Sequence, residues 1–64
     1  MKNLALKMAL LRKGQSQYRL AQLLDCDPSV VSRIANGWVI PNKDMKRRIA
    51  EHLGEPPEEL FPES

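Results

Sequence analysis

Residues 16–37 read SQYRLAQLLDCDPSVVSRIANG, and this stretch ends one apolar helix pattern only to begin another three residues later. Leucine and alanine recur at helical spacing from Leu20 to Leu24, and Ser16 stands where a helix N-cap is expected. Residues 25–27 then interrupt the pattern with two aspartates and a cysteine. The stretch therefore predicts two short helices joined by a tight turn.

The second of these helices has clear signals at both ends. Asp27 followed by Pro28 favours a helix start, because the carboxylate accepts free amide protons and proline lacks the N–H that would be left over. Asn36 and Gly37 tolerate a positive φ and therefore favour a helix end. We predict a helix over about residues 28–35.

The N-terminal part of the chain also has a helical pattern. Leu4, Met8 and Leu11 fall at i, i+4 and i+7, on one face of a helix over about residues 2–13. Gly14 stands where this helix should end. We expect this apolar face, including its methionine, to be buried in the core.

Two more helical segments are predicted after the loop WVIP at residues 38–41. Asn42 fits the N-cap of the first segment, which should end at Gly54, and PPEELF at residues 56–61 predicts one short turn. No stretch alternates with period two, so the fold class that we predict is all-α. The side chains that these two segments should bury are Met45, Ile49, Leu53, Leu60 and Phe61.

Length and composition limit the class of protein. With 64 residues, the chain is expected to be a single domain over residues 1–64 with a small core. Cys26 is the sole cysteine, which excludes an intrachain disulfide, and Cys26 with His52 gives too few ligands for a structural metal. The apolar runs are too short to span a membrane, so we expect a soluble, cytoplasmic protein.

The formal net charge of +2 hides an asymmetry along the chain. Residues 1–50 contain all ten Lys and Arg and three acidic residues, and so carry a formal charge of +7. Residues 51–64 contain five glutamates and no basic residue, and the end over 55–64 is correspondingly acidic. A basic body attracts polyanions such as nucleic acid, although ordinary solvated surface charge explains the same pattern.

Two short helices joined by a tight turn, here over about residues 16–36, form a helix-turn-helix, whose second helix enters the major groove of DNA. At about 100° per residue, one side of the 28–35 helix is apolar and the opposite side carries hydroxyl and guanidinium groups. Such groups read bases: arginine binds O6 and N7 of guanine, and valine contacts a thymine methyl. The apolar side consists of Val31, Ile34 and Ala35, and the opposite side of Ser29 and Arg33, with Val30 and Ser32 on its flanks.

This pattern resembles the Cro/C1-type (XRE) family of helix-turn-helix DNA-binding domains over roughly residues 4–62. The resemblance implies an all-α, compact five-helix fold like that of lambda repressor. It further implies a transcriptional regulator, such as a repressor, that binds double-stranded operator DNA as a two-fold homodimer. The matching positions are Gln17, Leu20-Ala21, Leu24, Ser29, Val31, Ser32, Arg33, Ile34, Asn36 and Gly37, together with Pro41 and the closing LGEPPEELF.

The resemblance also implies roles for individual residues. Gln17 would contact a phosphate and brace the start of the recognition helix, while Asn36 would lie near the DNA backbone. Ser29, Ser32 and Arg33 would read bases. We add Tyr18, Pro28, Val30 and Lys43 as further candidate DNA contacts.

This chain departs from the family pattern at the turn and at the start of the recognition helix. Asp25 stands where glycine is usual, and aspartate tolerates the left-handed conformation better than most residues. Cys26 replaces a buried aliphatic residue, which is a mild change. Pro28 stands where many relatives carry a polar side chain, so direct readout at that position is limited to van der Waals contact.

Trp38, in the loop after the recognition helix, has two interpretations. Its large apolar area favours a partly buried anchor for the loop. The alternative is a contact with the DNA backbone or with a second subunit. We expect dimerisation to use the fourth and fifth helices or this loop, for example Val39 or Ile40.

The sequence thus predicts a DNA-binding regulator that needs no cofactor, metal or small-molecule ligand. A protein of another class, a protein-interaction module such as an antitoxin-like or phage accessory adaptor, is the alternative, because Pro28 and Val30 leave the reading helix poor in polar groups. An enzyme is the class that we expect least, since no spacing brings a nucleophile to a base.

Overall fold

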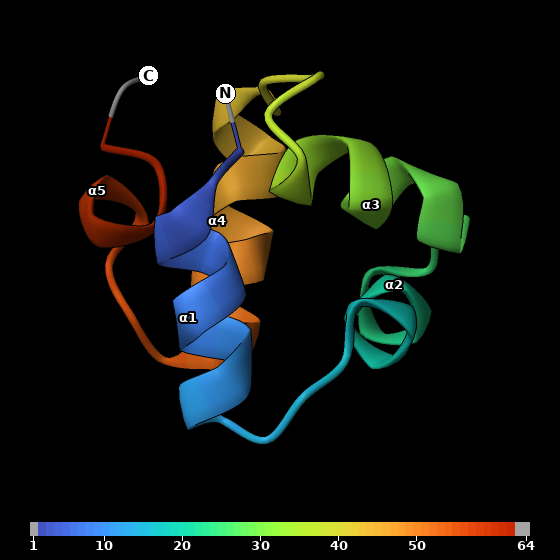
Figure 1. Cartoon of the computed structure of the whole chain (residues 1–64), viewed down its shortest axis with the longest axis horizontal. Helices are drawn as coiled ribbons and strands as arrows, with labels where there is room; N and C mark the ends of the chain where they lie inside the picture. The colour runs from blue at the N-terminus through green and yellow to red at the C-terminus, as the bar shows by residue number, and fades with distance from the viewer. Residues whose placement is uncertain (1, 63–64) are drawn as a thin grey trace.

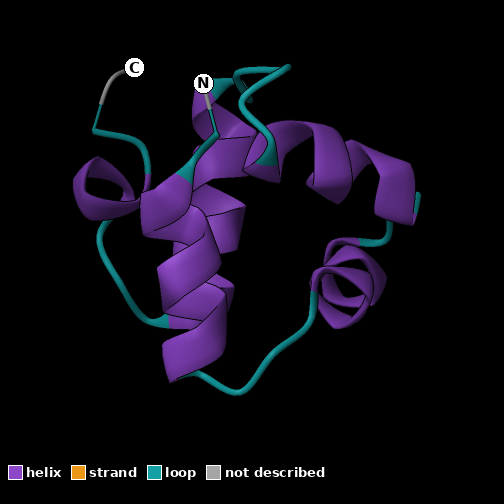
Figure 2. Ribbon diagram, in the orientation of Figure 1, coloured by secondary structure: helices purple, strands orange, loops and turns teal. Residues whose placement is uncertain are grey.

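The computed structural model describes residues 2–62, and over these residues the protein has five helices and no strand (Figures 1 and 2). The all-α class and the five-helix architecture are therefore confirmed, and the described chain measures 25 × 21 × 20 Å along its principal axes. The helices are α1 (Leu4–Arg12), α2 (Gln17–Leu24), α3 (Pro28–Ala35), α4 (Lys43–Leu53) and α5 (Pro57–Leu60).

Helices α2, α3 and α4 begin where the sequence places their N-caps. The side chains of Ser16, Asp27 and Asn42 each accept a hydrogen bond from a backbone N–H two or three residues later. Each bond satisfies a donor that the first turn of a helix leaves without an intrahelical partner. The predicted start of α3 at Pro28 is confirmed, and so is its predicted end at Ala35.

One side of every helix faces a common core. α2 packs against α3 and α4, whereas α1 packs against α3 and α5. Met45 is partly buried and packs against this core. Among the described residues, the buried apolar side chains are Leu6, Ala9, Leu10, Leu20, Ala21, Leu24, Val31, Ile34, Ala35, Ile49, Ala50, Leu53, Leu60 and Phe61.

The predicted buried face of α1 was wrong. Leu4, Met8 and Leu11 are exposed to 63%, 56% and 79%, while the buried side chains of α1 are Leu6, Ala9 and Leu10. Both sets have helical spacing, so α1 has two apolar stripes, and periodicity alone does not say which one faces inward.

Hydrogen bonds at Asn3 explain which stripe of α1 is buried. The Asn3 side chain caps α1 by accepting from the Leu6 N–H at 3.0 Å, and its Nδ2 donates to the Leu60 carbonyl at 2.9 Å. The Asn3 N–H also donates to the Ala35 carbonyl at 2.9 Å. These bonds join the start of α1 to the ends of α3 and α5, and they fix the rotation of α1 about its axis.

The interpretation of Trp38 as a partly buried anchor was also wrong, because its side chain is 76% exposed. The loop is held in two other ways. Its backbone is tied to α3, since the Trp38 N–H donates to the Arg33 carbonyl at 2.9 Å. The apolar anchor of the loop is Pro41, which is buried.

Candidate nucleic-acid interface

The turn between α2 and α3 sets the angle between the two helices. Asp25 adopts the left-handed conformation with φ 57° and ψ 47°, as expected at a position where glycine is usual. The Asp25 N–H donates to the Gln22 carbonyl at 3.1 Å and the Cys26 N–H to the Ala21 carbonyl at 3.0 Å. This pair of bonds is the Schellman motif, which satisfies carbonyls at the end of a helix.

A side chain from α4 strengthens the same turn. Arg48 Nη2 donates to the Leu24 carbonyl at 2.9 Å, so α4 caps the end of α2. A positive group at a helix C-terminus also interacts favourably with the helix dipole. Arg48 therefore has a structural contact within the fold, although the sequence offers it only as one of several basic residues on α4.

The two sides of α3 differ as the sequence predicts. Val31, Ile34 and Ala35 are buried at 3% exposure or less, and they fix α3 to the core. Pro28, Ser29 and Arg33 are exposed, whereas Val30 and Ser32 are partly buried on the flanks of the helix. The outer side of α3 thus presents a guanidinium, hydroxyl groups and small apolar surfaces.

The start of α2 offers a second set of polar groups. Gln17 and Tyr18 form the first turn of α2, where Gln17 is half-buried and Tyr18 is exposed. The Ser16 cap takes the N–H of Arg19, and the amides of this first turn point out of the helix. A helix N-terminus of this kind favours anions such as phosphate.

Asn36 links the end of α3 to α1. Its Nδ2 donates to Ser32 Oγ at 3.4 Å, and its Oδ1 accepts from Lys7 Nζ at 3.4 Å. Lys7 therefore lies beside α3, which the sequence did not reveal because the two residues are 29 positions apart. The ammonium group of Lys7 adds a positive charge next to the candidate DNA contacts Ser32 and Asn36.

Lys43 stands apart from the other candidates. It is the first residue of α4, beyond the loop that follows α3, and it is exposed. The structure thus groups Pro28, Ser29, Val30, Ser32, Arg33 and Asn36 on α3 and its C-cap, Gln17 and Tyr18 at the start of α2, and Lys43 on a third element.

Several basic side chains contact other groups of the same chain. Arg12 forms two bonds to the Glu55 carboxylate, at 2.7 and 2.9 Å, and Arg47 Nη2 donates to Asp44 at 2.6 Å. The Lys46 ammonium lies 5.8 Å from the centre of the Phe61 ring. Part of the charge of the basic body is therefore balanced within the fold, and the acidic end contributes to this through Glu55.

Asp27 keeps a negative charge at the start of α3. The Ser29 N–H donates to Asp27 Oδ1 at 2.9 Å, and this backbone bond holds the pKa of the carboxyl below its usual value of 3.8. The Ser29 side chain and the charge of Arg33 lower the pKa of Asp27 further. The carboxylate therefore stabilises the start of α3 as a charged N-cap.

Within residues 2–62, His, Cys, Asp and Glu side chains form no group of three or more that could hold a metal ion. None of the helices in this part of the chain is both long and apolar enough to cross a bilayer.

A family model described as Helix-turn-helix, of the Cro/C1 type, matches residues 6–60, which include all five helices except the first two residues of α1. The chain belongs to the Cro/C1-type helix-turn-helix family. It is therefore a helix-turn-helix DNA-binding regulator, in which α2 and α3 form the motif. Comparisons with curated proteins and with solved structures each gave no significant match.

Proposed function

We propose that this helix-turn-helix protein is a sequence-specific transcriptional regulator of the repressor type, which binds double-stranded operator DNA by placing α3 in the major groove. The observation that carries the proposal is the exposed outer side of α3, on a helix whose other side packs against α2 and the core. Base edges would be read by α3, while phosphates would be held by the first turn of α2. Such a regulator acts where the DNA is, and we propose a cytoplasmic location.

Arg33 is the proposed main base-reading residue. It is exposed on the outer side of α3, and its guanidinium fits O6 and N7 of guanine. Ser29 and Ser32 would add hydroxyl contacts, and Pro28 and Val30 would contribute van der Waals contacts to thymine methyl groups. This distribution concentrates the polar readout on three side chains.

Phosphate contacts are proposed to come from residues around α3. These contacts position the protein on the duplex and carry no sequence information directly. The proposed residues are Gln17, Tyr18, Asn36 and Lys43.

The experiment that tests this function begins with selection of a duplex from random DNA. We expect a palindromic operator with half-sites about 34–36 Å apart, as two-fold homodimers of this motif require. On that operator, Arg33→Ala should weaken binding by about 1–3 kcal/mol and relax the preference at one base pair. Binding curves on the operator and on single-base variants measure both effects.

Arg47→Ala is the matched control for Arg33→Ala. Arg47 is also an exposed arginine, but it lies on α4 and is bonded to Asp44 at 2.6 Å. We expect a small, sequence-independent change in affinity from this control. Equal affinity and equal base preference for Arg33→Ala and the unmodified protein would remove Arg33 from the reading surface.

A protein-interaction module is the second candidate function, favoured by the apolar Pro28 and Val30 on the reading side. A salt titration separates it from DNA binding. For DNA binding, affinity should fall by about 0.9 log units per log unit of salt for each phosphate neutralised. A chain that binds no duplex at low salt would instead support the interaction module.

A further inference from the structure

We infer that the loop after α3 and the groove beside it form the contact between two copies on the operator, with Trp38 of each copy seated in the groove of the other. The inference rests on the proposed function, because the DNA brings the two copies together. It names the surface that this contact uses.

The loop after α3 exposes three consecutive large apolar side chains. Trp38 and Ile40 are 76% and 70% exposed, and Val39 lies between them at 45%. The backbone bond from Trp38 to Arg33 and the buried Pro41 hold this loop in place. Contiguous exposed apolar side chains on an ordered loop are typical of an interaction surface.

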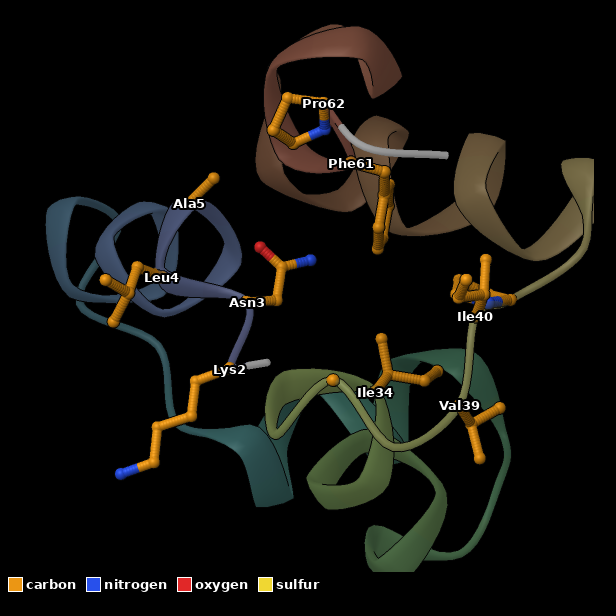
Figure 3. A pocket seen from close by; sticks show the side chains of 11 residues that line it. Lys2, Asn3, Leu4, Ala5, Ile34, Val39, Ile40, Phe61 and Pro62 are labelled. Atoms are coloured by element: carbon orange, nitrogen blue, oxygen red, sulfur yellow. The ribbon is translucent and has the colours of Figure 1, made fainter.

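A groove of about 510 Å³ lies directly beside this loop. Ile34, Ile40, Phe61 and Asn3 face one another across it, and they come from α3, the loop, the end of α5 and the start of α1 (Figure 3). Its volume is in the range of pockets that hold small organic molecules, about 300–1,000 Å³, and is sufficient for an indole ring. Trp38 does not line the groove of its own chain.

A second copy of this chain fits the groove because the surface is self-complementary. A two-fold interface uses the same patch on both copies, so a protruding side chain must lie next to the hollow that receives its equivalent. Trp38 and the groove share the loop and meet this requirement.

The size of the protein favours the same occupant. Half-sites one helical turn apart place two copies about 34–36 Å apart, centre to centre. The protein measures 25 Å along its longest axis between Cα atoms. With the longest axis along the line between the half-sites, about 10 Å remains between the two backbones. Packed β-sheets have the same backbone separation, and side chains fill that gap, so side chains of the two copies can meet. Since the loop directly follows α3, a contact there joins the ends of the two reading helices.

The area of the patch predicts that this contact is weak without DNA. An aromatic side chain buries about 150–250 Å², so Trp38 with its two aliphatic neighbours supplies on the order of 400 Å² per copy. A stable interface buries about 800 Å² per partner. The free protein should therefore be largely monomeric, and the two copies should bind the operator cooperatively.

The test compares a full operator with a duplex that carries one half-site. We expect the second copy to bind the full operator at least about 10-fold more tightly than the first, because the linked sites raise its effective concentration. Trp38→Ala should reduce this factor to about 1 and leave half-site affinity unchanged. Ile40→Lys, which places a charge in the same contact, should act in the same direction.

Two controls make the outcome specific. Leu11→Ala removes an apolar side chain that is 79% exposed and lies outside the groove, and this variant should keep the cooperativity. Trp38 is the sole tryptophan, so its fluorescence reports its surroundings directly. Its emission should move to shorter wavelength on the full operator, but not on the half-site.

The inference and the proposed function fail in different ways. Cooperativity that survives Trp38→Ala, or a Trp38 emission equal on both duplexes, would overturn the inference while half-site binding still supported DNA recognition. If the chain binds no duplex, the proposed function fails. The inference then fails as well, because the operator is what brings the two copies together.

Discussion

α1 and α3 are helices of nine and eight residues that pack against one another and against the same core, but they differ in the side turned away from it. α3 carries Ser29 and Arg33 on its outer side, whereas α1 carries Leu4, Met8 and Leu11. An apolar stripe identifies a buried face only where the opposite face is polar. α3 met this condition and α1 did not.

The largest loss of stability is expected at Leu6, the fully buried leucine of α1. Leu6→Ala should cost about 2–5 kcal/mol, because the core loses a side chain and gains a cavity. A core of this size supplies roughly 3–5 kcal/mol, so the variant should be largely unfolded. Urea denaturation followed by circular dichroism measures the loss.

Leu4→Ala and Leu11→Ala are the matched controls, since they remove the same side chain from the exposed stripe of the same helix. Each should change the free energy of unfolding by less than about 0.5 kcal/mol. If the controls cost as much as Leu6→Ala, the two stripes of α1 would be equally buried and the contrast with α3 would disappear.

A smaller effect is expected at Asn3, which selects the inward stripe of α1. Asn3→Ala removes both the cap on α1 and the bond to the Leu60 carbonyl, and should cost about 1–2 kcal/mol. Asn3→Asp keeps the capping oxygen but cannot donate to Leu60. Its stability in urea denaturation should therefore be intermediate. If Asn3→Asp were as unstable as Asn3→Ala, the whole loss of stability would come from the hydrogen bond to Leu60 of α5.

The difference between the two helices also explains which of their features the sequence predicts. The ends of α3 depend on neighbours in the chain, namely Asp27-Pro28 and Asn36-Gly37, so they were predictable. The rotation of α1 depends on the bond from Asn3 to Leu60, 57 residues away, and no local pattern encodes it.

The candidate interface also combines features that local sequence predicts with features that depend on the tertiary structure. Its exposed residues on α3 followed from helical geometry, whereas the contact between Lys7 and Asn36 and the capping of Leu24 by Arg48 required the tertiary structure. The large apolar area of Trp38 favours a partly buried anchor, but its side chain is exposed, and Pro41 and a backbone hydrogen bond hold the loop instead.

The smallest effect is expected at Asp27, which fixes the start of α3 with a charged cap. Because the pKa of Asp27 is lowered in the folded protein, its ionised form stabilises the fold above the ordinary value of 3.8. That contribution should be lost as the pH falls below 3.8 and through the lower pKa of the folded state. The melting temperature, measured from neutral to acidic pH, follows this loss.

Asp27→Asn isolates the charge from the cap. Asparagine is as good an N-cap as aspartate, so at neutral pH the variant should melt close to the unmodified protein. It has no carboxyl to titrate, and the small advantage of the unmodified protein should therefore shrink as the pH falls through the pKa of Asp27. A constant difference at every pH would mean that the cap acts through its hydrogen bond to Ser29 alone, and α3 would then begin as α1 does at Asn3, without any contribution from charge.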